Sequence, residues 1–324
     1  MSAPVLVVDQ PGAMPELSIV VPVYNEAEAI LPFLSTVINC VESSASSFEL
    51  IIVDDGSEDE TALIVSHLSA RDSRLTLVRL SRNFGKEAAL DAGLMIAKGR
   101  ALLFMDADYQ HPPYLIASMV ESWRAGADVV NAKKRARGYE HRWYRFLSHR
   151  FNQLFTSLSG VPLDGASDFK LIDRQVAEAL KQCPERNRFF RGLVAWVGFH
   201  QQDILFDVGE RHAGRSGWSY GRLFSYAVNN ILAFTSFPLI AIAGLGAAAI
   251  VVSVVLVIQT LFNYMLGNAV QGFTTVLVAI AFFGSVTLLS VGVVALYVAK
   301  IYDEQKARPV YLVKVTRRQC ERHE

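Results

Sequence analysis

The sequence predicts an α/β fold, with a doubly wound and mostly parallel sheet, followed by a transmembrane hairpin of two helices. Two observations carry this prediction. Apolar runs of strand length alternate with segments of helical spacing between residues 17 and 210, which is typical of a parallel sheet covered by helices. A stretch without any Asp, Glu, Lys, Arg or His then extends from Leu223 to Ala299, and no soluble domain needs so long a run without charge.

The expected strands are short apolar runs bounded by polar residues. They lie at Leu17–Val23, Leu50–Val53, Leu75–Leu80, Ala101–Met105 and Asp128–Ala132, with a late candidate at Ile204–Val208. Helical apolar spacing predicts the intervening helices at Ala27–Val41, Asp59–Ala70, Lys86–Ala97 and Pro112–Trp123. Ser57-Glu58-Asp59-Glu60 resembles a capping box before the second helix. We expect residues 1–16 to form a flexible leader and residues 17–210 to form the main domain.

Two segments of the charge-free stretch are long enough to cross a bilayer. At about 1.5 Å per residue, Leu239–Ile258 and Phe273–Val298 can each span a hydrocarbon core of about 30 Å. Both are apolar on all faces, which favours membrane spans over two buried core helices. Asn263–Gly272 joins them without a charge. We therefore assign residues 238–299 to a hairpin in the membrane.

Basic residues lie on the outer flanks of this hairpin and are absent from its connecting loop. Arg215 and Arg222 precede the first span, and Lys300, Lys306, Arg308, Lys314, Arg317, Arg318 and Arg322 follow the second. The positive-inside rule then predicts a multi-pass protein of the inner or plasma membrane with its main domain and both termini in the cytoplasm. Residues 211–237 are expected to form an amphipathic juxtamembrane segment, or else to continue as a helix into the first span. Residues 300–324 are expected to be a cytoplasmic tail.

Other features of the composition narrow the class of protein. The amino terminus lacks a basic start followed by an apolar core, so we expect no signal peptide. Cys40, Cys183 and Cys320 are odd in number and share no close spacing, which suits reduced thiols rather than disulfides or a zinc site. Small residues in the spans, such as Gly244 and Gly284, would permit helix packing and a homo-oligomer.

Asp106 and Asp108 follow the strand expected at Ala101–Met105, where an apolar run stops at Asp-Ala-Asp. Ligands of open α/β sheets bind at the carboxyl ends of strands. Two carboxylates that close repel each other unless a cation lies between them, and hard oxygen ligands suit Mg²⁺ or Mn²⁺. The pair therefore predicts a metal–diphosphate site, with a solvated turn as the alternative.

Two further strand ends carry acidic groups or a turn into a helix. Asp54 and Asp55 end the second strand, where they would accept hydrogen bonds from a uracil edge or ribose hydroxyls; helix capping by Asp55 or Ser57 is the alternative. Asn83 lies in the turn after the third strand, free to approach a ligand, and Lys86 follows either as a phosphate contact or as a solvated residue at a helix start. No GxxxxGK[ST] or GxGxxG follows any strand, so a P-loop and a dinucleotide fingerprint are unsupported.

Taken in order, four segments resemble the inverting nucleotide-sugar glycosyltransferases of the GT-A fold. These segments read VPVYNE, IIVDDGSEDET, SRNFGKEAALDAGL and LLFMDADYQHPP. Later segments, GASDFKLIDR, NRFFRGLVAWVGF, RHAGRSGWSYGRL and KIYDEQKARPVY, resemble the polyprenyl-phosphate glycosyltransferases, which include bactoprenol glucosyltransferases and dolichyl-phosphate mannosyltransferases. The two-span hairpin resembles the bactoprenol type, and the resemblance extends from Leu17 to Tyr311.

The resemblance implies roles for the residues that match the family's motifs. The nucleotide-sugar site would comprise Pro22, Tyr24, Glu26, Asp54, Asp55, Asp106 and Gln110, to which the turn adds Asn83 and Lys86. Asp106 and Asp108 would hold the metal, and the catalytic residues would be Asp108, Asp168 and Arg211. The acceptor phosphate would meet Lys134, Arg137, Arg191, Arg211 and Arg215. For Asp168, the alternative is a plain ion pair with Lys170 or Arg174. Trp196, like Arg191, would lie near the acceptor, and a place in the core is its alternative.

The sequence departs from the family pattern at two positions. Gly217 follows the Ser of the R-x-x-G-x-S segment where many relatives carry Lys, which leaves one phosphate-neutralising charge missing. Near the end of the second span, Ala295-Leu296-Tyr297 stands where Gly-Glu-Tyr is frequent. Arg215 or Lys134 could replace the missing charge, and the second departure puts in doubt any carried-over role for an intramembrane carboxylate.

The basic stretch from Lys133 to Arg150 interleaves arginines with aromatic residues. Nucleic-acid binding is one interpretation of such a pattern, but the membrane spans and zero net charge make it the weakest. Anionic lipid headgroups, which attract each nearby basic residue by about 1 kcal/mol, and the acceptor phosphate are both compatible partners.

The predicted reaction is inverting transfer of a sugar from a nucleotide diphosphate to polyprenyl (undecaprenyl) phosphate at the cytoplasmic membrane face. UDP-glucose is the favoured donor, with GDP-mannose, a UDP-aminoarabinose derivative and UDP-GlcNAc as alternatives. A phosphate monoester is largely ionised at neutral pH, so Asp168 is as suitable for positioning the acceptor as for acting as a base. A catalytically silent membrane scaffold is the alternative from another class. A processive synthase would need more spans and a Q-x-x-R-W motif, and a lipid-linked sugar flippase would not need the acidic strand ends.

Overall fold

The computed structural model describes residues 14–108, 111–134, 168–183, 185, 189–206, 237–266 and 272–317. The chain divides into two compact units. The first comprises Met1–Gly217 together with Pro309–Glu324, and the second comprises Trp218–Arg308.

The first unit is built on a mixed sheet of eight strands, ordered β7-β5-β6-β4-β1-β2-β3-β8. The strands are β1 (Leu17–Val23), β2 (Phe48–Asp54), β3 (Leu75–Leu80), β4 (Ala101–Phe104), β5 (Val129–Lys134), β6 (Lys170–Asp173), β7 (Gln201–Phe206) and β8 (Val313–Arg317). The central strands β4, β1, β2 and β3 are parallel, as is the pair β5 and β7. The predicted α/β class with a mostly parallel, doubly wound sheet is confirmed.

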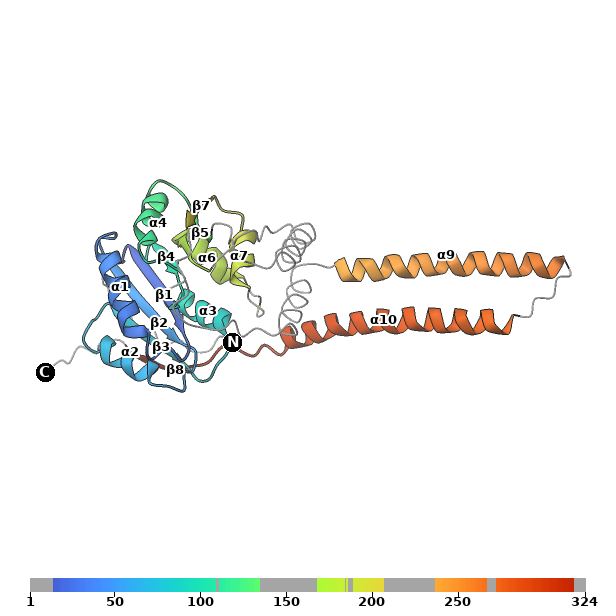
Figure 1. The fold of residues 1–324 in the computed structure, drawn as a ribbon, viewed down its shortest axis with the longest axis horizontal. Coiled ribbons are helices and arrows are strands. Elements are labelled where there is room, and N and C mark those ends of the chain that lie inside the picture. Colours follow the sequence, from blue (N-terminus) through green and yellow to red (C-terminus); the bar gives the residue numbers. More distant parts are fainter. Residues whose placement is uncertain are drawn as a thin grey trace. The chain divides into compact units, whose positions relative to one another are not determined.

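Alternate residues of the central strands point to opposite faces, and each face carries its own helices (Figure 1). One face packs against α1 (Ile30–Glu42), α2 (Thr61–Ser69) and α4 (Leu115–Arg124). The other packs against α3 (Lys86–Ile96), α6 (Arg174–Gln182) and α7 (Phe190–Trp196). In β4, for example, Leu103 belongs to the first hydrophobic cluster while Leu102 and Phe104 belong to the second. Both faces of the central sheet are therefore buried.

The structure differs from the sequence prediction at several elements: the helices α6 and α7 and the strands β6 and β8 were not predicted, and β7 lies at Gln201–Phe206 where a strand was expected at Ile204–Val208. The antiparallel strands β6 and β8 were not predicted, because four or five residues with charged members give no clear apolar pattern. The predicted capping box before α2 is wrong. The helix begins at Thr61, whose N–H and hydroxyl both donate to Asp59 Oδ1, while the Ser57 hydroxyl accepts the backbone N–H of Asn25.

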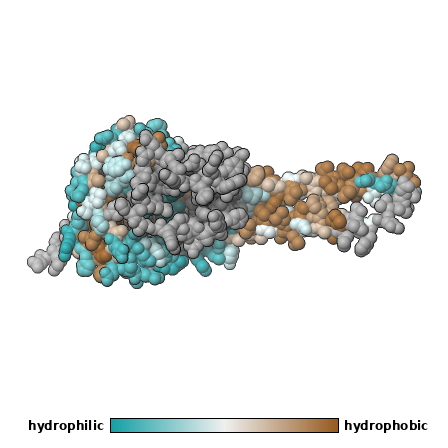
Figure 2. Space-filling view, viewed as in Figure 1, coloured by the Kyte–Doolittle hydropathy of each residue, from teal (hydrophilic) through white to brown (hydrophobic). Residues whose placement is uncertain are grey.

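The second unit contains a pair of long apolar helices, α9 (Phe237–Met265) and α10 (Phe273–Gln305). The described residues include two segments long and apolar enough to cross a membrane, Phe237–Asn263 and Val278–Gln305, and none of the residues in their most apolar windows is buried. Apolar side chains cover the surface of both helices (Figure 2). The helix α10 continues beyond the expected span end at Val298, through Lys300 and Asp303.

The chain that follows α10 returns to the first unit as the strand β8. This strand pairs antiparallel with β3, and the backbone N–H of Ser81 donates to the carbonyl of Leu312 at 2.8 Å. Tyr311 and Phe84 pack against the same hydrophobic cluster. The expected tail thus supplies an edge strand beside the turn that leads into α3.

Val315→Pro is expected to destabilise the first unit by about 1–2 kcal/mol and lower its melting temperature by about 3–6 °C. Proline cannot donate to a strand ladder, and Val315 lies opposite Arg79 in the β3–β8 pair. Thermal melting of the full chain, with Val315→Thr as the control, measures this. Equal melting temperatures for the two variants would show that β8 contributes no stability.

Candidate active site

The direction of winding of the sheet reverses between β1 and β4, which are neighbours in the parallel centre. Segments that leave β1 and β4 emerge at the same edge, where ligands of open α/β sheets bind. Tyr24–Glu26 follow β1, and Asp106–Asp108 follow β4. The pairing of β1 with β4 extends one residue beyond β4, since the N–H of Met105 donates to the carbonyl of Val20. The two predicted acidic segments therefore leave the sheet from neighbouring strands.

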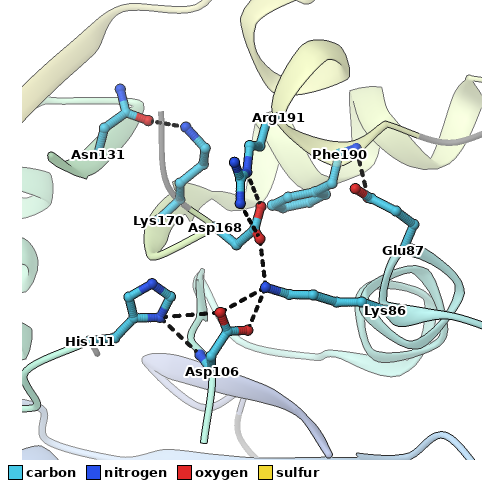
Figure 3. A network of polar contacts seen from close by, with 9 residues as sticks. All are labelled: Lys86, Glu87, Asp106, His111, Asn131, Asp168, Lys170, Phe190 and Arg191. Atoms are coloured by element: carbon cyan, nitrogen blue, oxygen red, sulfur yellow. Dashed lines mark hydrogen bonds and ion pairs between the residues drawn. The ribbon is translucent and has the colours of Figure 1, made fainter. Parts of the chain in front are cut away.

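Four charged side chains form a continuous network beside this edge (Figure 3). Lys86, the first residue of α3, places Nζ 2.6 Å from Asp106 Oδ1, 2.7 Å from Asp106 Oδ2 and 2.5 Å from Asp168 Oδ2. Arg191, on α7, donates from Nε to Asp168 Oδ1 at 2.5 Å and from its second guanidinium nitrogen to Oδ2 at 2.7 Å. The network joins the segments after β4 and before β6 through two cations and two carboxylates.

Asp168 forms ion pairs with Lys86 and Arg191, and not with Lys170 or Arg174, which the sequence offered as alternative partners. Lys170 Nζ donates to the side-chain oxygen of Asn131, and Arg174 contacts Glu178 instead. Lys86 lies at the start of α3 and is exposed, as expected, but its ammonium also contacts two carboxylates. These pairings join residues 20 and 82 positions apart, which local sequence patterns do not reveal.

Opposite charges and hydrogen bonds hold Asp168 and Lys86 in their ionised forms against the effect of burial. Burial alone would raise the pKa of Asp168, but hydrogen bonds and charge from Arg191 and Lys86 outweigh it and hold the pKa well below its usual range. Burial lowers the pKa of Lys86, yet the carboxylates of Asp106 and Asp168 raise it above its ordinary value. Asp168 and Lys86 therefore keep their charges throughout the neutral range.

Carboxylates gather on the side of the site that faces Glu26. Burial, followed by the charges of Asp108, Asp59 and Asp106, raises the pKa of Glu26. Such mutual repulsion is relieved by a cation, and hard carboxylate oxygens are the ligands of Mg²⁺ or Mn²⁺. The described residues contain no group of three or more His, Cys, Asp or Glu side chains arranged to hold a metal. Asp106 and Asp108 carry oxygen ligands of the kind that Mg²⁺ takes, since its sites use one or two carboxylates together with substrate phosphates.

Asp55 holds the turn that leads to Lys86. Its two carboxylate oxygens accept the backbone N–H groups of Phe84 and Gly85 at 2.7 and 2.9 Å. Gly56, at a φ of 72°, lies so close to this turn that a Cβ would meet the backbone of Arg82 at 2.4 Å. The carboxylate predicted to meet a nucleoside is thus used by the protein to shape the loop, and direct ligand contact stays a prediction.

Asp54 is fully buried and has a similar internal role. Its Oδ1 accepts the N–H of Ser57 at 2.9 Å, and Arg79 Nε lies 3.1 Å from Oδ2 in an ion pair without hydrogen-bond geometry. Arg79 also donates to the carbonyl of Ser57. Helix capping, the alternative for Asp55 or Ser57, is not what the side chains of these two residues do. Asp54 and Asp55 fix the turns after β2 and β3.

Asn25, which sequence reasoning missed, ties the segment after β1 to the segment after β2. It adopts a φ of 55°, its side-chain oxygen accepts the N–H of Glu58, and its own N–H donates to the Ser57 hydroxyl. Asn tolerates this left-handed conformation better than most residues. Pro22 lies within β1 opposite Val53, and Tyr24 beside Asn25 is partly exposed. Asn25 thereby fixes how Tyr24 and Glu26 leave the sheet.

His111 was also missed, although it follows the Asp-Ala-Asp segment closely. Its Nδ1 accepts the backbone N–H of Asp106 at 3.0 Å, and its ring stacks on Phe169 at 5.1 Å between centroids. The imidazole is buried. It orients the backbone of Asp106 and links the segment after β4 to the residue that follows Asp168.

Lys170 is a buried cation close to Arg191. Burial, followed by the charge of Arg191, lowers the pKa of Lys170 to about 8. Asn131 receives its hydrogen bond and in turn donates to Gln201 and Asp203. A lysine in a four-residue strand carries no signal of this environment in the sequence.

Several predicted residues cannot be located. Gln110, Arg137, Arg211 and Arg215 lie outside the described residues, as does the side chain of Lys134, whose backbone ends β5. Their roles stay predictions. Asn83 lies in the turn before α3, and its carbonyl accepts a hydrogen bond from Arg82. Trp196 at the end of α7 is 62% exposed, so a place in the core is wrong.

Glu87→Gln is expected to stabilise the protein at alkaline pH relative to wild type. Burial, with the nearby charge of Asp168, raises the pKa of Glu87 to about 7, although the carboxylate accepts the N–H of Phe190. A carboxyl with a raised folded-state pKa contributes stability that is complete below about pH 4.5 and lost as pH rises through about 7. The loss amounts to at most about 3 kcal/mol, and Gln avoids it.

Melting temperatures of wild type and Glu87→Gln at pH 5 and pH 8 test this dependence. The advantage of the variant should be larger at pH 8, while Glu178→Gln on the surface of α6 should show no such pH dependence. An advantage that is equal at both pH values would contradict the raised pKa.

Comparison with known proteins identifies the family to which this chain is similar. The profile of glycosyl transferase family 2 matches residues 18–181. The chain is 38% identical over 303 residues to an uncharacterized glycosyltransferase of Synechocystis, with 92% of this chain and 94% of that protein covered. It is 37% identical over 308 residues to the SfII prophage-derived bactoprenol glucosyl transferase of Shigella flexneri, with 94% and 99% covered.

Further similarities reach a third relative and a solved structure. The putative glycosyltransferase CsbB of Bacillus subtilis is 35% identical over 300 residues, with 92% of this chain and 91% of that protein covered. The crystal structure of glucosyl-3-phosphoglycerate synthase from Mycobacterium tuberculosis with Mn²⁺ and UDP-glucose is 20% identical at a TM-score of 0.45, covering 67% and 77% of the two chains. On the family profile and the long, nearly full-length matches, the chain is a glycosyltransferase that belongs to glycosyl transferase family 2.

Proposed function

We propose that this glycosyltransferase moves a sugar, with glucose from UDP-glucose as the best-supported donor, onto a polyprenyl phosphate such as undecaprenyl phosphate. The name of the Shigella flexneri relative, which covers nearly the whole chain, supports a lipid carrier as acceptor and glucose as the sugar. The long apolar helices α9 and α10 suit an enzyme whose acceptor has its tail in a bilayer.

The observation that carries this proposal is the network of Lys86, Asp106, Asp168 and Arg191. It joins an acidic strand end, suited to the metal and diphosphate of the donor, to a guanidinium suited to a phosphate acceptor. Arg is the residue best suited to phosphate because its planar fork presents several donors. Donor and acceptor charges would therefore meet on either side of Lys86 and Asp168.

The proposed reaction is a single displacement with inversion at C1 of the sugar. An oxygen of the acceptor phosphate forms the new bond to C1 while the bond from C1 to the diphosphate oxygen breaks, and the nucleoside diphosphate leaves with the electron pair. A divalent cation held by Asp106 and Asp108 supplies charge stabilisation for that leaving group. Arg191 and the other basic residues predicted to meet the acceptor phosphate would hold the incoming phosphate in line. Such proximity and orientation would provide much of the rate.

Asp168 acts in this scheme by positioning rather than as a base. Its carboxylate is held ionised by Arg191 and Lys86 and has a pKa well below its usual range, so it has little tendency to take a proton. The acceptor phosphate is itself largely ionised at neutral pH and needs little help from a base. Asp168 would then orient Arg191 toward the acceptor.

We further propose the arrangement in the membrane that the charged flanks predict. Both helices would span the bilayer, with residues 17–210 and both termini in the cytoplasm, because basic residues flank the outer ends of the pair and the connection lacks them. Packing through the small residues of the spans would allow a homo-oligomer.

Transfer of label tests the proposed reaction. Purified full-length protein is incubated with undecaprenyl phosphate, Mg²⁺ or Mn²⁺, and a panel of radiolabelled UDP- and GDP-sugars, and label entering the lipid phase is counted. Label from one donor, lost in Asp108→Ala, would establish the reaction and name the sugar. No label from any donor, in folded protein that also fails to bind nucleotide-sugar, would indicate a silent membrane scaffold instead.

A further inference from the structure

Lys86 lies where an incoming cation would have to bind. Its ammonium contacts both carboxylate oxygens of Asp106, at 2.6 and 2.7 Å, and one oxygen of Asp168 at 2.5 Å (Figure 3). The side chain of Lys86 is 39% exposed and that of Asp106 is 22% exposed, so the contact is open to solvent on one side. An internal cation thus occupies the carboxylate that the donor's metal would use.

Among the residues that the structure describes, the other groups around Asp106 leave the neutralising role to Lys86. His111 Nδ1 is 3.7 Å from Asp106 Oδ2, but it accepts the backbone N–H of Asp106 and so presents a lone pair rather than a proton on that side. Further carboxyl groups lie nearby, since the charges of Asp108 and Asp106 both raise the pKa of Glu26. The ammonium of Lys86 offsets charge that would otherwise accumulate at this strand end.

We propose that Lys86 is an exchangeable counter-ion, which balances Asp106 before the donor arrives and leaves Asp106 when a divalent cation binds there. The proposal rests on the proposed function in that the cation is the one accompanying the nucleotide-sugar. Nζ contacts both oxygens of Asp106, so a metal that coordinates this carboxylate directly would share at least one oxygen with the ammonium of Lys86. Two cations on one carboxylate also repel each other strongly at such separations.

Release from Asp106 would leave Lys86 bound to Asp168 alone. An ammonium has three donors, so at least one then becomes available to an anion on the side of Arg191. Occupation of the donor side would in this way increase the positive charge offered to the acceptor phosphate. The exchange predicts that the donor with its metal binds before the acceptor.

The exchange is tested by measuring Mn²⁺ binding in the absence of any nucleotide or lipid acceptor. Mn²⁺ is titrated into the full-length protein in detergent, and free Mn²⁺ is followed by its electron paramagnetic resonance signal. Lys86→Met should bind Mn²⁺ with a Kd about tenfold lower than wild type, because the competing charge is gone. Lys181→Met removes a charge paired with Glu178 on α6 and should leave the Kd unchanged.

Two more variants separate charge from packing. Lys86→Arg keeps a cation at this position and should bind Mn²⁺ nearly as weakly as wild type. Asp106→Asn removes the shared carboxylate, so adding Lys86→Met to it should no longer tighten binding. Circular dichroism and thermal melting establish that each variant is folded.

Equal or weaker Mn²⁺ binding by folded Lys86→Met, or binding by neither protein, would overturn the exchange. The outcome does not depend on sugar transfer. If no donor gives transfer but Lys86→Met still binds Mn²⁺ more tightly, the proposed function fails and the exchange stands. If transfer occurs and the two Kd values agree, the reverse holds.

Discussion

Asp106→Asn is expected to lower the rate of sugar transfer by about 10²–10³-fold without unfolding the protein. Loss of one preorganised group that stabilises transition-state charge costs roughly this factor. Asp106 follows the buried strand β4 and contacts Lys86 through both oxygens, so the change removes the proposed metal ligand and the partner of Lys86 together. Because the side chain is partly exposed, the fold should tolerate the amide.

Initial rates of label transfer under saturating donor, together with melting temperatures, measure this effect. Glu178→Gln, which neutralises a carboxylate on the surface of α6, serves as the matched control and should keep wild-type activity. An Asp106→Asn protein that is folded and transfers sugar at the wild-type rate would remove this strand end from the reaction.

Asp168→Ala is expected to destabilise the protein by about 2–3 kcal/mol and to reduce transfer strongly. The carboxylate is only 5% exposed and receives three hydrogen bonds from Lys86 and Arg191. Removing one partner of a buried ion pair costs about 3–5 kcal/mol, and the expected value is lower because both cations reach solvent. Without Asp168, the two cations face each other and Arg191 loses its orientation.

The pH dependence of this loss distinguishes an ion pair from simple packing. A carboxyl whose pKa is lowered on folding contributes stability that is present above its unfolded value, near 3.8, and is lost as pH falls further. The difference in melting temperature between wild type and Asp168→Asn should therefore be smaller at pH 3 than at pH 5. An equal difference at pH 3 and pH 5 would contradict the ionised state described here.

Periodicity alone predicted the parallel centre of the sheet, because β1, β2, β3 and β4 are buried on both faces and read as continuous apolar runs. The same pattern predicted where Asp106 and Asp108 lie, since both follow the end of β4. The short strands β6 and β8 escaped because they are antiparallel additions whose position depends on the strands already formed.

The electrostatic part of the site depended on tertiary contacts that no local pattern reports. Lys86 and Asp168 are 82 positions apart, and the sequence offered Lys170 as a nearer partner for Asp168. The fold turns Lys170 toward Asn131 and brings Arg191 from α7 instead. Likewise, Asp55 is spaced as a ligand-binding residue would be, yet its oxygens hold the turn before α3.

Mass spectrometry of the lipid product tests the central claim most directly. Purified protein, UDP-glucose and Mg²⁺ are incubated with undecaprenyl phosphate or, as the matched control, with undecaprenol, which lacks the phosphate. We expect a lipid heavier by one hexose with the phosphate acceptor, none with the alcohol, and none from Asp108→Ala. Free glucose released without any glycosylated lipid, or equal product from the alcohol, would contradict transfer to a lipid phosphate at this site.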